Sequence, residues 1–219
     1  MTHLHIPDGV LPVWLWVTGW LVTLVLLWRS GRHATTQTIA YQGALGGLML
    51  AAMSLPLGPF EYHLSLAGPV GVLIGPGGAF QIAFVTSAIL ALFGHGGLTV
   101  IGLNTIIIGL ASTGAWLAFR VLGARLKPAW ALATSTAVGQ VVAGGAWFAV
   151  VAVAARRGTP GVTGDAHAHH GVLLALALPL WLLGTVVEAA VAWGVGRFLA
   201  RVHPGLLPLT PAATRGTPS

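Results

Sequence analysis

Histidine is the residue type in this chain best suited to do chemistry. The sequence contains nine histidines and no cysteine, so a bound metal ion would have to be held by nitrogen or oxygen donors. Two of the histidines, His3 and His5, lie close to the amino terminus. A histidine near a free terminal amine can supply amine, amide and imidazole nitrogens together, a planar donor set that suits Ni(II) or Cu(II). The alternative interpretation is that these N-terminal side chains are simply solvated.

A second histidine-rich stretch lies between residues 158 and 171. Within six residues it contains Asp165 and three histidines, namely His167, His169 and His170. Such a tract could chelate a metal ion weakly and concentrate it near a more ordered site. We do not expect it to be the principal site, because an ordered cavity needs ligands that helices hold in place. A polar loop that happens to be rich in histidine would have the same composition.

Glu188 is the only carboxylate deep inside an apolar segment. An ionisable group at such a position is costly unless it is paired or faces water, so it is a candidate functional residue. A purely structural role, through pairing with Gln140, Arg197 or a backbone group, explains its presence equally well.

The elements that carry these residues are very apolar. The chain has 219 residues, of which 56% are hydrophobic and only 6% are charged, and its mean hydropathy is +0.87. A soluble domain usually has about 25% charged residues. Apolar runs near the length of about 20 residues that a helix needs to cross a bilayer recur along almost the whole chain. The lipid bilayer is therefore the expected solvent.

We predict an all-α integral membrane protein with about seven transmembrane helices. The expected segments are residues 11–28, 39–57, 64–77, 79–94, 99–119, 129–155 and 171–196. The division between the third and the fourth depends on the breaker cluster Gly75-Pro76-Gly77-Gly78. This cluster either turns the chain at the membrane surface or interrupts a helix inside the protein.

The basic residues predict the orientation, because Lys and Arg favour the cytoplasmic side of short loops. With the N-terminus outside and the C-terminus cytoplasmic, eight of the ten basic residues lie inside, and Arg156 and Arg157 lie outside. The same topology places seven of the nine histidines and Asp8 on the outer side. The orientation is predicted from Lys and Arg alone, without the histidines. Metal capture or proton sensing would explain why most histidines lie on the outer side.

Several function classes are disfavoured by the sequence. The net charge of +6 does not indicate nucleic acid binding, because the basic residues are scattered between apolar runs and form no basic stripe. An intramembrane hydrolase that uses histidines with Glu188 would need a spacing such as His-Glu-x-x-His, which is absent. No Gly-x-x-x-x-Gly-Lys-Ser/Thr pattern is present either, so we expect no enzyme activity and no ATP hydrolysis by this chain.

Three stretches, in order, resemble the CbiM/NikM family, the substrate-specific membrane subunits of energy-coupling factor (ECF) transporters for cobalt and nickel. The run His5-Ile6-Pro7-Asp8-Gly9-Val10-Leu11-Pro12 is similar to the family's N-terminal motif. Residues 53–76, which include His63, resemble the family's second metal histidine and the helix behind it. Residues 93–99 and then Gly102-Leu103-Asn104-Thr105 resemble the loop and helix start that follow. The match covers residues 5–112 well and the remainder only as hydropathy.

The resemblance implies a protein that captures Ni(II) or Co(II) outside the cell as the transported substrate and uses no organic cofactor. The implied ligands are His5 and His63, and the implied supporting shell, which orients ligands by hydrogen bonds, is His95, Asn104 and Asp8. The implied partners are a transmembrane coupling subunit, two ATP-binding subunits and often a small accessory membrane subunit. The implied location is the bacterial cytoplasmic membrane. Residues 1–202 would form one transmembrane domain with a metal-binding segment at 1–10, followed by a disordered cytoplasmic tail at 203–219.

The N-terminus departs from the family pattern, because three residues precede Leu4-His5. If Met1 is retained, Met1, Thr2 and His3 supply an amine, two amides and an imidazole. If Met1 is removed, Thr2 and His3 regenerate the amine, amide and imidazole set, and a fourth position stays open for His63 or His5. We favour the second hypothesis.

The helix that contains Asn104 departs from the pattern too, since the family has a second Asn and a Met shortly after the first Asn. Here Asn104 is followed by the run Thr105-Ile106-Ile107-Ile108. The two departures leave open an alternative function, a non-transporting membrane metal sensor or assembly protein of the same fold.

Overall fold

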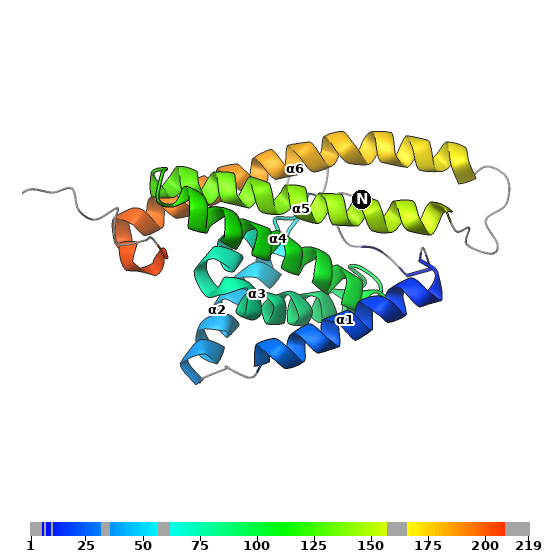
Figure 1. Cartoon of the computed structure of the whole chain (residues 1–219), viewed down its shortest axis with the longest axis horizontal. Helices are drawn as coiled ribbons and strands as arrows, with labels where there is room; N and C mark the ends of the chain where they lie inside the picture. Colours follow the sequence, from blue (N-terminus) through cyan, green and yellow to red (C-terminus); the bar gives the residue numbers. More distant parts are fainter. Residues whose placement is uncertain are drawn as a thin grey trace, which may run out of the picture.

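The computed structural model describes residue 6 and residues 8–9, 11–31, 36–56, 62–156 and 166–208, with only the backbone described at 36–37, 155–156 and 166–176. These residues form six α-helices and one short 3-10 helix (Figure 1). The elements are α1 (Val13–Gly31), α2 (Thr36–Ser54), α3 (Ala67–Leu92), α4 (Ile101–Leu122), α5 (Pro128–Arg156), α6 (Ala166–Val202) and η1 (Pro204–Leu206). The predicted all-helical fold is confirmed for this part of the chain.

Most helices begin and end near the predicted segments. The segments at 11–28, 99–119, 129–155 and 171–196 correspond to α1, α4, α5 and α6. Among the described residues, five helices are long and apolar enough to span a membrane, namely α1, α3, α4, and the apolar parts of α5 and α6. α2 is not among these five.

The predicted count of seven segments is not confirmed, and α3 covers the segments at 64–77 and 79–94 as two helical stretches that meet at a kink. This element contains one non-helical residue, Gly75, with φ 78° and ψ 169°, and Pro76 follows it. Glycine adopts positive φ without a steric penalty, and proline cannot donate the backbone hydrogen bond that would continue the helix. The breaker cluster therefore ends one helical stretch and begins the next, and its position relative to the membrane surface stays a prediction.

The break at Gly75 reverses the direction of α3. A straight helix of this length would measure about 39 Å. His63, shortly before α3, and His95, shortly after it, nevertheless have ring centroids only 5.6 Å apart. α3 therefore bends back on itself (Figure 1), and the two loops that flank it lie side by side.

Polar side chains surround the break. Gln42 of α2 donates a hydrogen bond to Gln81 of α3 (2.8 Å), and Gln81 donates to the hydroxyl of Ser30 at the end of α1 (3.2 Å). These groups line a small cavity together with residues 74–78. The bend is thus held in place by hydrogen bonds between three helices.

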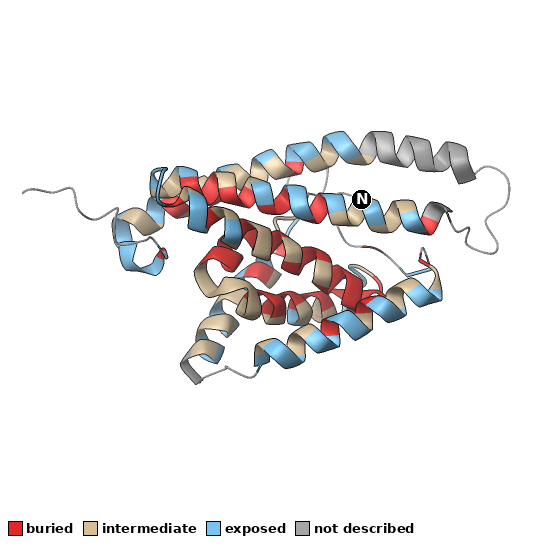
Figure 2. Cartoon of the chain, in the orientation of Figure 1, coloured by how far each residue is buried: buried red, intermediate tan, exposed pale blue. Residues whose placement is uncertain are grey.

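The core of the bundle lies around α3 and α4, where the buried residues concentrate (Figure 2). Small residues permit close approach of the helices there. A Cβ atom on Gly71 of α3 would overlap the backbone of Ser112 of α4, and one on Gly139 of α5 would overlap the carbonyl of Ala111. At the periphery, α1 exposes large apolar side chains such as Leu21 and Trp28, as expected of a helix that faces lipid.

α1 starts at one end of the bundle and α6 finishes at the other (Figure 1). Which of these ends faces the cytoplasm stays a prediction. Beyond α6, Leu207 is buried in a small apolar cluster with Phe119 and Leu132. Of the predicted tail at 203–219, residues 203–208 are described and Leu207 packs on the bundle, whereas residues 209–219 lie outside the described residues.

Candidate metal centre

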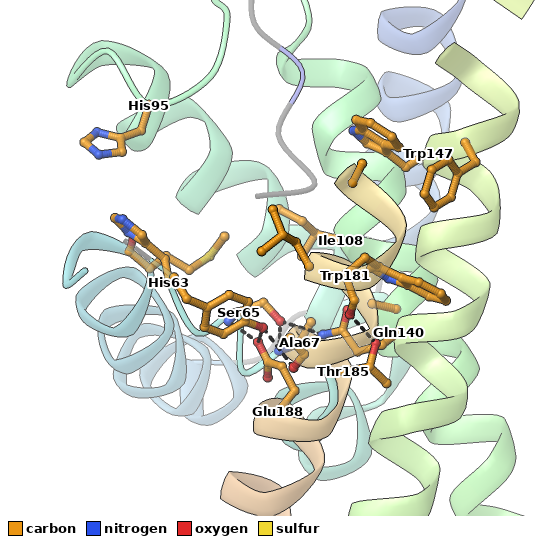
Figure 3. Close-up of a pocket in the computed structure, with 17 residues that line it drawn as sticks. His63, Ser65, Ala67, His95, Ile108, Gln140, Trp147, Trp181, Thr185 and Glu188 are labelled. Carbon is orange, nitrogen blue, oxygen red and sulfur yellow. Dashed lines mark hydrogen bonds between the residues drawn. The ribbon is translucent and has the colours of Figure 1, made fainter. Parts of the chain in front are cut away.

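A cavity of about 100 Å³ is enclosed by the loops on either side of α3 and by α4, α5 and α6. Its lining includes the imidazoles of His63 and His95, the aromatic side chains of Trp147, Phe148 and Trp181, and the polar residues Tyr62, Ser65, Gln140 and Glu188. Figure 3 shows the two histidines on one side and the tryptophans on the other, with Glu188 further from the histidines. The cavity therefore combines nitrogen donors with apolar walls, which is typical of a small-ligand site.

The two imidazoles lie close enough to share an ion. Their ring centroids are 5.6 Å apart, with 53° between the ring planes. Metal–imidazole bonds of about 2.0–2.1 Å place the rings of two ligands on one ion at comparable separations. The structure thus brings together His63, predicted as a ligand, and His95, predicted to support it.

A hydrogen bond fixes the tautomer of His63. Its Nδ1 contacts the backbone carbonyl of Met53 in α2. Because a carbonyl oxygen can only accept, Nδ1 is the donor in this contact, and in a neutral imidazole Nε2 is then the nitrogen whose lone pair can bind a metal ion. A backbone partner of this kind is the usual way in which proteins orient a histidine ligand.

Asn104 anchors the N-terminal segment beside the two histidines. Its side-chain oxygen accepts a hydrogen bond from the amide of Ile6 (2.9 Å), and its side-chain nitrogen donates to the carbonyl of Ile6 (3.2 Å). The same carbonyl accepts from the amide of Gly97, which lies in the loop that contains His95 (3.2 Å). Ile6 is buried, with 2% of its surface exposed.

Asp8 binds the same loop. Its carboxylate accepts hydrogen bonds from the amide of Leu98 (2.8 Å) and from the amide (2.9 Å) and hydroxyl of Thr99. The hydrogen bond from the Thr99 hydroxyl is the main reason that the pKa of Asp8 is lowered; burial opposes this shift, and the two amides add to it. A Cβ atom on Gly97 would overlap Asp8, so only glycine fits at that position.

The remaining predicted ligands are not placed. Met1, Thr2, His3 and His5 lie outside the described residues, and so do the side chains of His167, His169 and His170. The described part of the chain contains no group of three His, Asp or Glu residues that could hold a metal ion. To hold a metal ion, His63 and His95 would therefore need a further ligand from outside the described residues.

The carboxylate of Glu188 contacts the segment that contains His63. Glu188 is 1% exposed, and its Oε1 accepts hydrogen bonds from the backbone amide of Ser65 and from the hydroxyl of Tyr62 (3.4 Å). Gln140 donates to the hydroxyl of Ser65 (3.1 Å). The sequence suggested Gln140, Arg197 or a backbone group as structural partners of Glu188. Of these, the partner that bonds to Glu188 directly is a backbone group, the amide of Ser65. The guanidinium of Arg197 lies over the ring of Trp193 instead.

The family model described as the cobalt uptake substrate-specific transmembrane region, CbiM, matches residues 5–206. The chain belongs to the CbiM family. It is therefore the membrane component of a metal transporter and crosses the membrane several times. The CbiM match begins at His5, the histidine that the N-terminal motif aligns with the family.

Solved structures agree with this fold. The chain is similar to a truncated transition metal transporter, with a TM-score of 0.76 and 18% identity over 91% of this chain and 99% of that one. It is also similar to a second transition metal transporter structure, with a TM-score of 0.75 and 18% identity over 90% of this chain and 93% of that one. No curated protein matches the chain.

The CbiM-like motifs did not predict every residue around the cavity. Tyr62, Ser65 and Met53 contact the two key side chains, but the sequence signals none of them. Met53 contacts His63, and Ser65 contacts Glu188, through backbone groups. Tyr62 is one of two tyrosines in the chain and belongs to no recognisable motif of its own. Thr99 lies within a motif, but its bond to Asp8 becomes visible only when the loop is folded.

Proposed function

We propose that this CbiM family member is the substrate-binding membrane component of an ECF-type transporter that takes up Ni(II) or Co(II). It captures the ion at the outer face of the bacterial cytoplasmic membrane. A transmembrane coupling subunit and two ATP-binding subunits, with or without a small accessory membrane subunit, supply the energy.

The observation that carries this proposal is the anchoring of the N-terminal segment. The amide and the carbonyl of Ile6 both form hydrogen bonds with Asn104, and the carbonyl also accepts one from the loop that contains His95. Asp8 accepts a hydrogen bond from the same loop. His5 is joined directly to Ile6 in the chain. The histidine-rich N-terminus is thereby tethered to the loop that contains one of the two cavity imidazoles.

The proposed ligand set combines His63 with donors from the N-terminus, which are the imidazole of His5 or His3 and the amine and amide of Met1 or Thr2. His95 supports His63 or serves as a further imidazole donor. A set that includes a deprotonated amide nitrogen favours Ni(II) over Co(II). His167, His169 and His170 form a weaker accessory tract that concentrates metal outside.

Isothermal titration of the purified protein with NiCl₂ and CoCl₂ tests the ligand set. His63→Ala should weaken binding by at least about 100-fold, because loss of a ligand exceeds the about 10–100-fold cost of losing an outer partner. His5→Ala and His3→Ala distinguish which N-terminal imidazole contributes. His203→Ala is the matched control, because His203 is exposed beyond the end of α6 and should leave the affinity unchanged. Equal affinities of the His63 and His203 variants would contradict the proposal.

Uptake separates a transporter from a sensor. Cells that express this protein with its coupling and ATP-binding partners should accumulate more nickel or cobalt than cells with an empty vector. Tight binding without accumulation would instead favour the non-transporting sensor or assembly protein, which the altered N-terminus and the Thr105–Ile108 run left open.

A further inference from the structure

His63 lies on a short non-helical segment, residues 62–66, that joins the cavity to the start of α3. Leu66 ends this segment in the left-handed region, with φ 52°, and the hydroxyl of Ser65 accepts a hydrogen bond from the amide of Ala67 at the start of α3 (3.3 Å). A ligand on such a segment has no regular backbone hydrogen bonds to hold it. Its position must therefore be set by groups from other helices.

Glu188 of α6 supplies such a group on both sides of His63. Its Oε1 accepts from the amide of Ser65, two residues after His63, and from the hydroxyl of Tyr62, one residue before it. The hydroxyl proton of Tyr62 is shared with the carbonyl of Gly184, one turn earlier in α6 (3.1 Å). A side chain before the imidazole and a backbone amide after it are thus tied to a single turn of α6 (Figure 3).

The surroundings are shaped for this contact. A Cβ atom on Gly184 would lie 2.6 Å from the ring of Tyr62, so the glycine is needed for the tyrosine to reach α6. Ser65 is held a second time by Gln140 of α5, which donates to its hydroxyl (3.1 Å). Glu188 also lies at the start of α3, where unpaired amide groups and the helix dipole favour a negative charge.

The other carboxylate oxygen of Glu188, Oε2, is buried and has no hydrogen-bond partner among the described residues. In Figure 3 it points away from the two histidines. The carboxylate therefore engages the His63 segment through one oxygen only. This geometry suits an acceptor that fixes a backbone more than a direct ligand of an ion held by the imidazoles.

We propose that Glu188 is a positioning residue for His63, which holds the imidazole at the metal site through the amide of Ser65 and the hydroxyl of Tyr62. The proposal rests on the proposed function, because it assigns Glu188 to the same metal site. It explains why a carboxylate is kept in an apolar helix, where it would otherwise be costly.

Metal titration of Glu188 variants tests the proposal. Glu188→Gln keeps a carbonyl oxygen that can accept from Ser65 and Tyr62, so its Ni(II) affinity should stay within about threefold of the wild type. Glu188→Ala removes the acceptor and should weaken Ni(II) binding by about 10–100-fold, the range observed when outer partners of metal ligands are lost. In a His63→Ala background, Glu188→Ala should cause no further loss, because it acts through His63.

Thr23→Ala is the control for a general loss of packing. Thr23 is fully buried in α1 and donates to the carbonyl of Gly102, with no contact to residues 62–66. It should lower the melting temperature and leave Ni(II) affinity unchanged. Wild-type affinity in Glu188→Ala, or an equal loss in the presence and absence of His63, would overturn the proposal.

A metal-free measurement separates this proposal from the proposed function. The ring ¹⁵N shifts of His63 should report the Nδ1-protonated tautomer in the wild type and in Glu188→Gln, and a mixture of tautomers in Glu188→Ala. Unchanged shifts in Glu188→Ala would overturn the positioning role. Loss of the tautomer in Glu188→Ala, in a protein that binds no nickel or cobalt, would uphold it and refute the proposed function alone.

Discussion

Asp8 shows how one side chain can hold a segment that has no secondary structure of its own. Its two carboxylate oxygens accept three hydrogen bonds from Leu98 and Thr99. These bonds favour the charged form, and they lower the pKa of Asp8 against the opposing effect of burial. Asn104 complements this contact by both donating to and accepting from Ile6, which an aspartate at that position could not do.

Acidification should release this anchor. A lowered pKa means that Asp8 stabilises the fold above the ordinary aspartate pKa of about 3.9, and that this contribution disappears as the pH falls through the lower value of the folded state. We expect Asp8→Asn to lower the melting temperature at pH 6 and the gap to the wild type to narrow toward pH 3. The chain has only four carboxylate side chains, so few other groups titrate in this range. Parallel melting curves of the two proteins across this range would contradict the assignment.

At the scale of the element, α3 decides which residues can meet. Its break at Gly75 brings the loop before the helix and the loop after it to the same end, where His63 and His95 face each other. A continuous helix of the same length would keep these loops far apart. The conformation of one glycine thus determines whether the two imidazoles share a cavity.

Gly75→Ala should therefore be destabilising and should weaken metal binding. Gly75 has φ 78° and ψ 169°, a region that is essentially restricted to glycine and costs another residue about 1–3 kcal/mol, although a Cβ atom at this position has no close neighbour. Gly145→Ala in α5 is the control, because it lies inside a helix with nothing within 4 Å of its Cβ position. It should be neutral or stabilising by up to about 1 kcal/mol. Thermal unfolding and Ni(II) titration measure both effects, and equal behaviour of the two variants would contradict this role of Gly75.

At the scale of the whole molecule, the distribution of charge predicts the orientation in the membrane. Arg29, Arg120 and Arg201 lie in the last turns of α1, α4 and α6, and Lys127 precedes α5. The candidate metal centre lies in loops at the other ends of α1 and α4, as shown by the bonds of Leu98 and Thr99 to Asp8. The positive-inside rule then predicts that the metal centre opens outside the cell.

Cysteine labelling can test this orientation directly, because the chain contains no cysteine of its own. Leu98, near the metal centre, is 52% exposed, and Leu126, in the turn between α4 and α5, is 39% exposed. A membrane-impermeant maleimide should label Leu98→Cys in intact cells and Leu126→Cys only after permeabilisation. The reverse pattern would show that the metal centre faces the cytoplasm.

The sequence by itself determined the all-helical membrane fold, the approximate positions of most helices and the family. Hydropathy is sufficient for this because a backbone in lipid must satisfy its hydrogen bonds internally, which leaves long apolar segments little choice but helix. The motifs also predicted that His63, His95, Asn104 and Asp8 belong to one region, since they recur in order in the family.

Only the tertiary structure decided how these residues are held. The break near Gly75 was predicted from the sequence, but the direction that the chain takes after it was not, because that direction depends on the helices packed around the break. The contact between Ser65 and Glu188 joins residues 123 positions apart, and the one between Ile6 and Asn104 spans 98. No local sequence pattern encodes such pairs. They depend on which helices pack side by side and on which face each helix presents to its neighbour.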